Sequence, residues 1–316
     1  MTRTLGKCWT TCCGKRKRSS PNCVVCTNDP RSSQHRAVER SRCNGTRFFV
    51  IATLPMRITT WNVNGLRAAI RKGLQRHLDA IRPDVLLLQE IRAQPDQLAP
   101  EWSQPAGWFV AWHPAERKGY AGTAIFARRP LRRVRRGLHP APDPEGRVLA
   151  ARIAGTPLEV LSVYLPSGSA SPQRQAAKEA WMDVFLPWSR QFLKRRHPVF
   201  LCGDLNIAHT ERDIFYAKSN EKNSGFLPHE REWFGRLLDL GWVDVVRRHF
   251  GPIQGPYSWW SNRGRARELD RGWRIDYVLC NRPAAKLVRS AAVHREGGLE
   301  VSDHAPVSVD IELEGL

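Results

Sequence analysis

The sequence predicts an α/β fold from residue 56 onward, and three observations support this prediction. Short apolar runs of strand length alternate there with amphipathic, helix-like segments. Strand-like runs occur in both halves of this region and interleave with the helical segments, so we expect one α/β domain over residues 56–316 and not two separable domains. Several of these runs end in a carboxylate or an amide, as the strands of an enzyme often do at a binding edge.

The expected elements follow one another along the chain. Strands are expected over residues 57–63, 84–88, 123–127, 148–153, 158–164, 199–202, 274–280 and 307–313. A helix over residues 72–82 is stopped by Pro83, and another over 229–240 is closed by Gly241. A long helix begins with Ser171 as its N-cap and Pro172 in its first turn, and a break is expected near Pro187.

The first 55 residues have a different composition. They contain 11 Lys+Arg against 2 Asp+Glu, and six of the eight cysteines, without a sustained helical or strand period. Three interpretations are open: a zinc site that includes Cys23 and Cys26, a targeting peptide, or a true start at Met56. The last is favoured, because a clean strand pattern begins at Met56. The prefix is then a mis-assigned start or a disordered extension.

Charge indicates the kind of partner. The formal net charge is +20, of which about +11 belongs to residues 56–316, and such an excess favours nucleic acid over a membrane surface. The sequence has no apolar run near the about 18 residues that a membrane span needs. Cys202 and Cys280 lie in apolar runs, which favours buried reduced thiols. We therefore expect a soluble, cytoplasmic protein that does not bind membranes.

Polar residues repeatedly end the predicted strands or follow them directly. These residues are Asn62, Glu90, Asp204, Asn206, Asp276, Asp303 and His304. One aspartate at a strand end is most often a turn or cap residue, but seven such positions make coincidence a poor explanation. If the strands pack side by side, these ends converge on one edge of the fold, where ligands bind.

The chemistry of these residues suits phosphodiester hydrolysis, which needs a metal ion, a base for water and donors for developing charge. Glu90 is the best candidate ligand, and an oxygen-rich site favours Mg²⁺, with Mn²⁺ as a substitute. Residues 56–316 lack paired His/Cys motifs, which disfavours zinc. Asp276 could hold one nitrogen of His304 and raise the basicity of the ring. For a histidine considered alone, a purely structural role is the simpler interpretation.

Six motifs in one order resemble exonuclease III and the related abasic-site endonucleases. They are TWNVNGLR at 60–67, LQE at 88–90, VYLP at 163–166, GDLNI at 203–207, WRIDY at 273–277 and SDHAP at 302–306. The resemblance covers residues 56–316 and leaves out the prefix. It implies a four-layer α/β sandwich with two packed β-sheets flanked by helices. It also implies cleavage of double-stranded DNA at abasic sites or at blocked 3′ ends by a monomer associated with the nucleoid.

The resemblance also implies roles for individual residues. Glu90 would hold Mg²⁺ with Asn64 and Asp303 nearby, and Asp204 would activate or position water. The residues expected to contact the phosphate or to orient such a contact are Tyr164, Asn206, Asp276, His304 and Asn62. The residues expected to line the substrate pocket are Asn223, in NEKNSGF at 220–226, and Trp259 and Trp273, which would wall a small base-less sugar.

The sequence departs from the family pattern in two places. Asn64 stands where some relatives have Asp, which removes a negative charge near the expected metal. Residues 167–169 fall where relatives vary, so the balance between internal cutting and 3′ trimming is open. Two alternatives to a DNA-repair nuclease are another hydrolase on the same scaffold, such as a non-specific nuclease or a phosphoinositide phosphatase, and a non-catalytic DNA-binding protein. The second would require loss of a reacting residue, and none is missing.

Overall fold

The computed structural model of the chain describes residues 42–43, 46–47 and 53–314. The chain divides into two compact units, Met1–Val50 and Ile51–Leu316. In the first unit, β1 (Arg42–Cys43) and β2 (Thr46–Arg47) pair antiparallel. The interpretation of Cys23 and Cys26 as zinc ligands lies outside the described residues.

Two mixed six-stranded sheets form the centre of the second unit. The first sheet has the strand order β13 (Val288–Val293), β14 (Val307–Glu314), β3 (Thr53–Asn62), β4 (Val85–Gln89), β6 (Thr123–Ala127), β5 (Phe109–His113). The second sheet has the order β11 (Val243–Asp244), β12 (Asp276–Cys280), β10 (Val199–Asp204), β9 (Glu159–Tyr164), β8 (Val148–Ile153), β7 (Leu131–Arg136).

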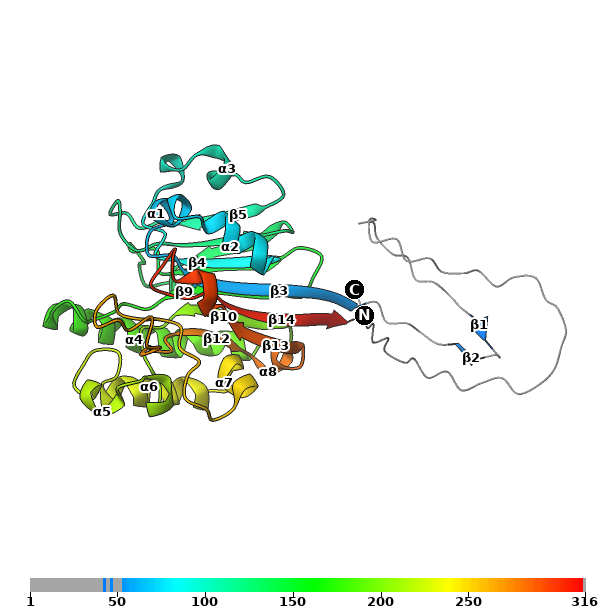
Figure 1. The fold of residues 1–316 in the computed structure, drawn as a ribbon. Coiled ribbons are helices and arrows are strands. Elements are labelled where there is room, and N and C mark those ends of the chain that lie inside the picture. Colours follow the sequence, from blue (N-terminus) through cyan, green and yellow to red (C-terminus); the bar gives the residue numbers. More distant parts are fainter. Residues whose placement is uncertain (1–41, 44–45, 48–52, 315–316) are drawn as a thin grey trace, which may run out of the picture. The chain divides into compact units, whose positions relative to one another are not determined.

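Helices cover the outer faces of both sheets, as Figure 1 shows. Helices packed on the first sheet are α1 (Leu66–Arg71) and α2 (Leu74–Ile81), whose apolar faces share a buried cluster with β3, β4 and β6. On the second sheet α4 (Pro172–Leu193) and α6 (Pro228–Asp239) do the same. A separate cluster fills the space between the sheets, with Ile58, Leu87, Phe200 and Val278 completely buried. The predicted four-layer α/β sandwich is confirmed.

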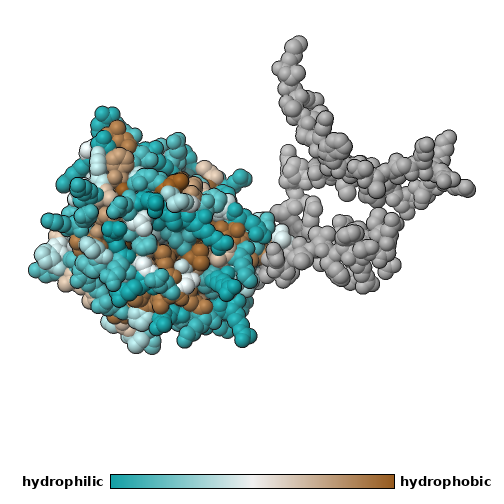
Figure 2. Space-filling view, turned by 90° about the horizontal axis from the view of Figure 1, so that it is seen from below, coloured by the Kyte–Doolittle hydropathy of each residue, from teal (hydrophilic) through white to brown (hydrophobic). Residues whose placement is uncertain are grey.

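Short elements complete the second unit. They are α3 (Pro100–Ser103), α5 (Ala217–Asn220), α7 (Val245–Phe250), α8 (Arg282–Ala285), α9 (Arg295–Gly298) and the 3₁₀ turns Pro95–Gln97 and Glu211–Asp213. In the part of the chain that the structure describes, no helix is both long enough and apolar enough to cross a membrane. On the face shown in Figure 2 hydrophilic side chains predominate, with hydrophobic ones in smaller areas between them.

Three predicted element boundaries are wrong. Strand β3 begins at Thr53, because residues 53–55 pair with the end of β14. The helix predicted over 72–82 is two helices, separated at Gly73, whose φ of 93° is left-handed and interrupts a right-handed helix. The long helix does not break at Pro187. Buried residues on both sides of it, Phe185 and Phe192, pack on the second sheet, and this packing outweighs the one lost backbone hydrogen bond.

Strand directions bring the polar strand ends to one edge. β3 and β4 are parallel in the first sheet, and β9 and β10 are parallel in the second. β12 and β14 run antiparallel to β10 and β3, so they begin where their neighbours end. Buried polar contacts hold the two sheets together close to this edge: Gln89 Nε2 donates to Ser162 Oγ at 2.9 Å, and Ser162 Oγ donates to the Leu88 carbonyl at 3.0 Å.

Candidate active site

Asn62 joins the two sheets at the centre of the candidate site. It is the last residue of β3 and is completely buried. Its Nδ2 donates to Glu90 Oε1 at 2.8 Å in the first sheet and to Asp204 Oδ2 at 2.9 Å in the second. Its Oδ1 accepts from the Asn64 backbone N–H at 3.0 Å. Asn62 therefore fixes the separation of two carboxylates that are 114 positions apart in sequence (204 minus 90).

Glu90 follows β4 directly and has a φ of 51°, a left-handed conformation that is unfavourable for a glutamate. Asn64 and Asn206 also have left-handed φ values, of 46° and 49°. Such strain concentrates at functional sites, where the surrounding structure enforces it. The second carboxylate oxygen of Glu90 accepts from Arg92 Nε at 2.9 Å and also pairs with the Arg92 Nη2 group. Sequence analysis did not identify Arg92.

Asp204 ends β10 and is buried in a network of donors. Its Oδ1 accepts from the Asn206 backbone N–H at 2.9 Å, and its Oδ2 accepts from Asn206 Nδ2 at 3.1 Å. Burial raises the pKa of Asp204 to about 7; the charges of Asp276 and Glu90 act in the same direction, and that of His304 opposes them. A carboxylate with a pKa near neutral can accept a proton from water at physiological pH and release it afterwards.

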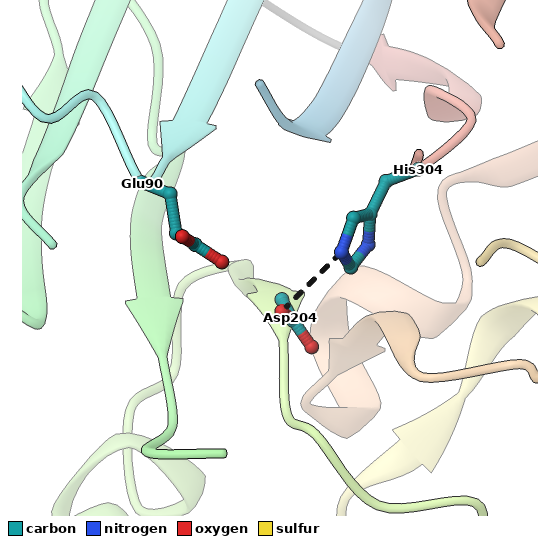
Figure 3. A group of neighbouring side chains, drawn as sticks. All are labelled: Glu90, Asp204 and His304. Atoms are coloured by element: carbon teal, nitrogen blue, oxygen red, sulfur yellow. Dashed lines mark ion pairs between the residues drawn. The ribbon is translucent and has the colours of Figure 1, made fainter. Parts of the chain in front are cut away.

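His304 and Asp276 form the predicted pair. His304 Nδ1 and Asp276 Oδ2 are 2.8 Å apart, and both side chains are buried. Burial disfavours the charged imidazole, but the adjacent Asp276 carboxylate outweighs it and, with Asp204 and Asp303, raises the pKa of His304 to about 10. Figure 3 shows Glu90, Asp204 and His304 pointing toward one another, with His304 Nε2 3.9 Å from Asp204 Oδ2. A protonated His304 can therefore donate from Nε2 to an anion in this space.

Asn64, Asp303 and Trp259 form a second group beside the carboxylates. Asn64 Nδ2 donates to Asp303 Oδ1 at 2.7 Å, and Trp259 Nε1 donates to Asp303 Oδ2 at 3.0 Å. Burial opposes ionisation of Asp303, but the charge of His304 and these two hydrogen bonds hold its pKa below the usual value. Asp303 is thus a carboxylate at neutral pH and connects the expected metal site to the wall of the expected sugar pocket.

The ligand types and spacing suit a divalent cation. Among the described residues, one group of three has ligand atoms within 4.8 Å of one another: Glu90, Asp204 and His304. His304 is poorly suited as a ligand, because its raised pKa keeps it protonated. The remaining donors are hard oxygens, which Mg²⁺ and Mn²⁺ prefer. Cys202 and Cys280 are buried in the core between the sheets.

An open cavity of about 1050 Å³ lies over these groups. It is lined by all the predicted site residues except Asn62 and Asp276, which lie buried beneath it: Asn64, Glu90, Tyr164, Asp204, Asn206, Asn223, Trp259, Trp273, Asp303 and His304. Asn223 is exposed at this cavity, and its Nδ2 donates to Asn220 Oδ1 at 2.9 Å. Burial, with the nearby Glu90 carboxylate, raises the pKa of the Tyr164 phenol well above its usual value, so the phenol is a donor at neutral pH.

Two tryptophans form the apolar end of the cavity. Trp259 and Trp273 meet edge to face, with ring centroids 5.9 Å apart. Gly225 lies against Trp273: a Cβ there would be 3.0 Å from the indole ring and 3.1 Å from the Asn206 carbonyl, and the φ of Gly225 is 94°. This position therefore needs glycine, because only glycine allows the close approach and the conformation together. The two indole rings stand at 87° to each other and together form an aromatic wall at this end of the cavity.

Comparisons with known proteins show which family the chain belongs to. The chain matches the model of the Endonuclease/Exonuclease/phosphatase family over residues 59–304, and it belongs to this family. It is 36% identical over 260 residues to an exodeoxyribonuclease of Bacillus subtilis (strain 168), which covers 82% of this chain and 100% of that protein. A DNA-(apurinic or apyrimidinic site) endonuclease of Dictyostelium discoideum is 32% identical, covering 82% of this chain and 71% of that protein.

The fold has a similar relative among solved structures. The 3′ phosphatase NExo from Neisseria, determined with product DNA hairpin, superposes with a TM-score of 0.74 at 34% identity. The superposition covers 81% of this chain and 99% of that one. The resemblance to exonuclease III and the abasic-site endonucleases is thereby confirmed.

Proposed function

We propose that this protein is a Mg²⁺-dependent phosphodiester hydrolase that acts on double-stranded DNA at abasic sites and at blocked 3′ ends. The observation that carries this proposal is the meeting of Glu90, Asp204 and the His304–Asp276 pair at one cavity, in a chain of this family. Relatives named exodeoxyribonuclease, abasic-site endonuclease and 3′ phosphatase support the substrate class. We further propose that residues 56–316 carry the activity as a cytoplasmic monomer.

Each residue has a step in the proposed reaction. Asp204 accepts a proton as water attacks phosphorus, because its pKa is near neutral. The protonated His304 donates from Nε2 to a non-bridging phosphate oxygen, and Asp276 keeps its ring in place. Asn206 and Tyr164 are further donors at the same cavity. The bond from phosphorus to the leaving O3′ then breaks, and this oxygen takes a proton from solvent water in the open cavity to give a 3′-hydroxyl end. Asp204 afterwards releases the proton that it accepted to the solvent.

The metal site proposed here comprises Glu90 as principal ligand, with Asn64 and Asp303 beside it. A Mg²⁺ ion held by these residues would supply positive charge that stabilises the phosphate during the reaction. Arg92 also pairs with Glu90 at this site. The substitution of Asn for the Asp of some relatives at position 64 leaves one fewer negative charge, so a moderate Mg²⁺ affinity is expected.

The pocket at Trp259 and Trp273 would select the substrate. An abasic sugar has an apolar face and no base, so it can pack against this aromatic wall. A full nucleotide would be too large for the same pocket. Asn223 would contribute an amide at the open side of the cavity.

The test uses the full chain and an end-labelled duplex with one abasic-site analogue, in Mg²⁺ or in EDTA. We expect Mg²⁺-dependent cutting on the 5′ side of the lesion, and removal of a 3′-phosphate at a nick in a second duplex. An intact duplex of the same sequence measures non-specific nuclease activity, and a soluble inositol phosphate measures phosphatase activity. Cleavage of the intact duplex at the same rate, or of the inositol phosphate alone, would refute the proposal.

A further inference from the structure

A completely buried ion pair lies beneath the cavity, outside the groups assigned above. Lys178 on α4 and Glu230 on α6 are 2.7 Å apart, and neither side chain has any exposed surface. Burying two charges is unfavourable unless hydrogen bonds satisfy their remaining donors and acceptors. A pair of apolar side chains would fill the same space without this requirement, so the hydrogen bonds of Lys178 and Glu230 indicate a role beyond packing.

Lys178 contacts a residue of the proposed reacting groups. Lys178 Nζ donates to the Asn206 backbone carbonyl at 2.9 Å. Asn206 has the left-handed φ of 49°, and its N–H and its Nδ2 both donate to Asp204. The Lys178 ammonium group therefore holds the carbonyl of Asn206, while the N–H and side-chain amide of the same strained residue position Asp204, the proposed base. An apolar side chain at position 178 could not provide this directional contact.

Glu230 contacts the backbone of the loop that forms part of the pocket wall. Glu230 Oε2 accepts from the Gly225 N–H at 2.6 Å and from the Leu227 N–H at 3.2 Å. Gly225 is the residue that lies against both the Trp273 ring and the Asn206 carbonyl. Glu230 Oε1 also accepts from Gln175 Nε2 at 3.0 Å, which ties the wall to the first turns of α4.

We propose that Lys178 and Glu230 are positioning residues that set the alignment of the Asp204–Asn206 turn with the Gly225–Trp273 wall. This inference rests on the proposed function. The two loops contact each other at Gly225, whose carbonyl accepts from the Ala208 N–H at 2.8 Å, and the pair joins both backbones to α4 and α6. Because Lys178 acts on the reacting groups, its loss affects turnover more than binding of the DNA backbone.

The test measures kcat, KM and duplex affinity of the full-length Lys178→Met variant on the abasic-site duplex, well below its Tm. We expect kcat to fall roughly 10- to 100-fold, since small misplacements of reacting groups have effects of this size, while duplex affinity stays close to wild type. Lys178→Met leaves Glu230 buried without its partner and risks misfolding. The double variant Lys178→Met/Glu230→Gln removes both charges, and we expect the same loss of kcat in a more stable protein.

Glu159→Gln is the matched control. Glu159 is 1% exposed and pairs with Arg135 and His197, but it lies at the start of β9, the end opposite Tyr164. We expect this variant to lose Tm and keep its kcat. Wild-type kcat in the folded double variant would overturn the inference, as would a kcat loss in Glu159→Gln in proportion to its Tm loss. Failure of the proposed function is distinguishable, because the wild-type protein would then not cut the abasic duplex.

Discussion

At the scale of single residues, the site brings together ionisable groups that lie only a few ångströms apart but have very different pKa values. Asp276 raises the pKa of His304 to about 10, whereas burial raises that of Asp204 to about 7. One group is thus fixed as a donor and the other can change state near neutral pH. Asn62 supplies neutral donors between the two carboxylates, which reduces their mutual repulsion without neutralising either.

Replacing Asp204 by Asn tests the assignment of the base. The amide keeps the size of the side chain but cannot accept a proton from water, so turnover should fall roughly 10³-fold while duplex binding persists. Single-turnover cleavage and fluorescence anisotropy with the abasic duplex measure the two quantities. Asp183→Asn, on the exposed side of α4, is the control and should behave as wild type. A parallel loss of binding and cleavage would contradict the assignment.

Replacing Glu90 by Ala tests the metal site. We expect the Mg²⁺ concentration for half-maximal activity to rise roughly tenfold or more, because changes at or around metal ligands commonly weaken affinity by that factor. Calorimetric titration of Mg²⁺ into the DNA-free protein gives a second, independent measurement. Glu101→Ala, at an exposed position of α3, controls for the loss of any surface carboxylate. Unchanged metal dependence would remove Glu90 as a ligand.

At the scale of elements, a buried cluster of ions holds the segments behind the pocket. Arg274 is 1% exposed; its Nε donates to Asp213 Oδ1 at 2.7 Å and its Nη1 to Asp244 Oδ2 at 2.8 Å. Asp244 also caps α7 by accepting from the Arg247 N–H. The cluster thereby connects a 3₁₀ turn, a short helix and the residues that lead into β12. It lies next to Trp273 and Asp276 in sequence and determines where both residues emerge.

This cluster makes part of the stability dependent on pH. Burial opposes the ionisation of Asp213, but Arg274 and Arg247 outweigh it and lower the pKa of this carboxyl to about 2, from 3.8 in an unfolded chain. The stabilisation, on the order of 2 kcal/mol, is therefore complete above pH 4 and is lost as the pH falls toward 2. Urea unfolding of wild type and Asp213→Asn checks this. The variant should be less stable at pH 7, and the difference between the two proteins should shrink below pH 4. A difference independent of pH would be the contrary result.

The pocket wall is built from three loops, and Trp273→Ala tests its role. We expect the preference for abasic over intact DNA, measured as a ratio of kcat/KM values, to decrease roughly tenfold, which is typical of removing one apolar wall from a pocket. Cutting of the abasic duplex itself should change less than this ratio. Trp102→Ala, in the half-buried α3 segment on the first sheet, serves as the control. An unchanged ratio would exclude Trp273 as a determinant of selectivity.

At the scale of the whole molecule, a fragment starting at Met56 should be active but less stable than one starting at Ile51. Residues 53–55 of β3 pair with residues 312–314 of β14, and Leu54 packs on the core between the sheets. Losing these contacts should lower the free energy of unfolding by about 1 to 2 kcal/mol, since each hydrogen bond contributes about 1 kcal/mol or less. The site lies at the other end of β3, so kcat should be equal in both fragments. Urea titration and the abasic-duplex assay compare them, and an inactive Met56 fragment that remains folded would contradict the proposed domain boundary.

Local pattern was sufficient for most of the elements and for the composition of the site. The strands over 123–127 and 148–153 agree with β6 and β8, because a continuous apolar run bounded by turns specifies a buried strand. The exposed edge strand β7, with four arginines in six residues, was not predicted, because its partner strand and not its own composition makes it a strand. Lys178 and Glu230 carried a recognisable signal. Each is a charged residue on the apolar face of its helix. Lys178 shares this face with Met182 and Phe185 on α4, and Glu230 shares it with Trp233 and Phe234 on α6.

By itself, the sequence determined an α/β domain of this family and the polar residues at its strand ends, because hydrophobic periodicity and short motifs are local properties of the chain. Only the tertiary structure decided which of these residues touch. The contact between Asn62 and Asp204 spans 142 positions, and that between Asn64 and Asp303 spans 239. Such distances are set by the packing of one sheet on the other and by strand direction. The contact between Lys178 and Glu230 arises in the same way, from two buried charges that become partners only when α4 and α6 pack side by side on the second sheet.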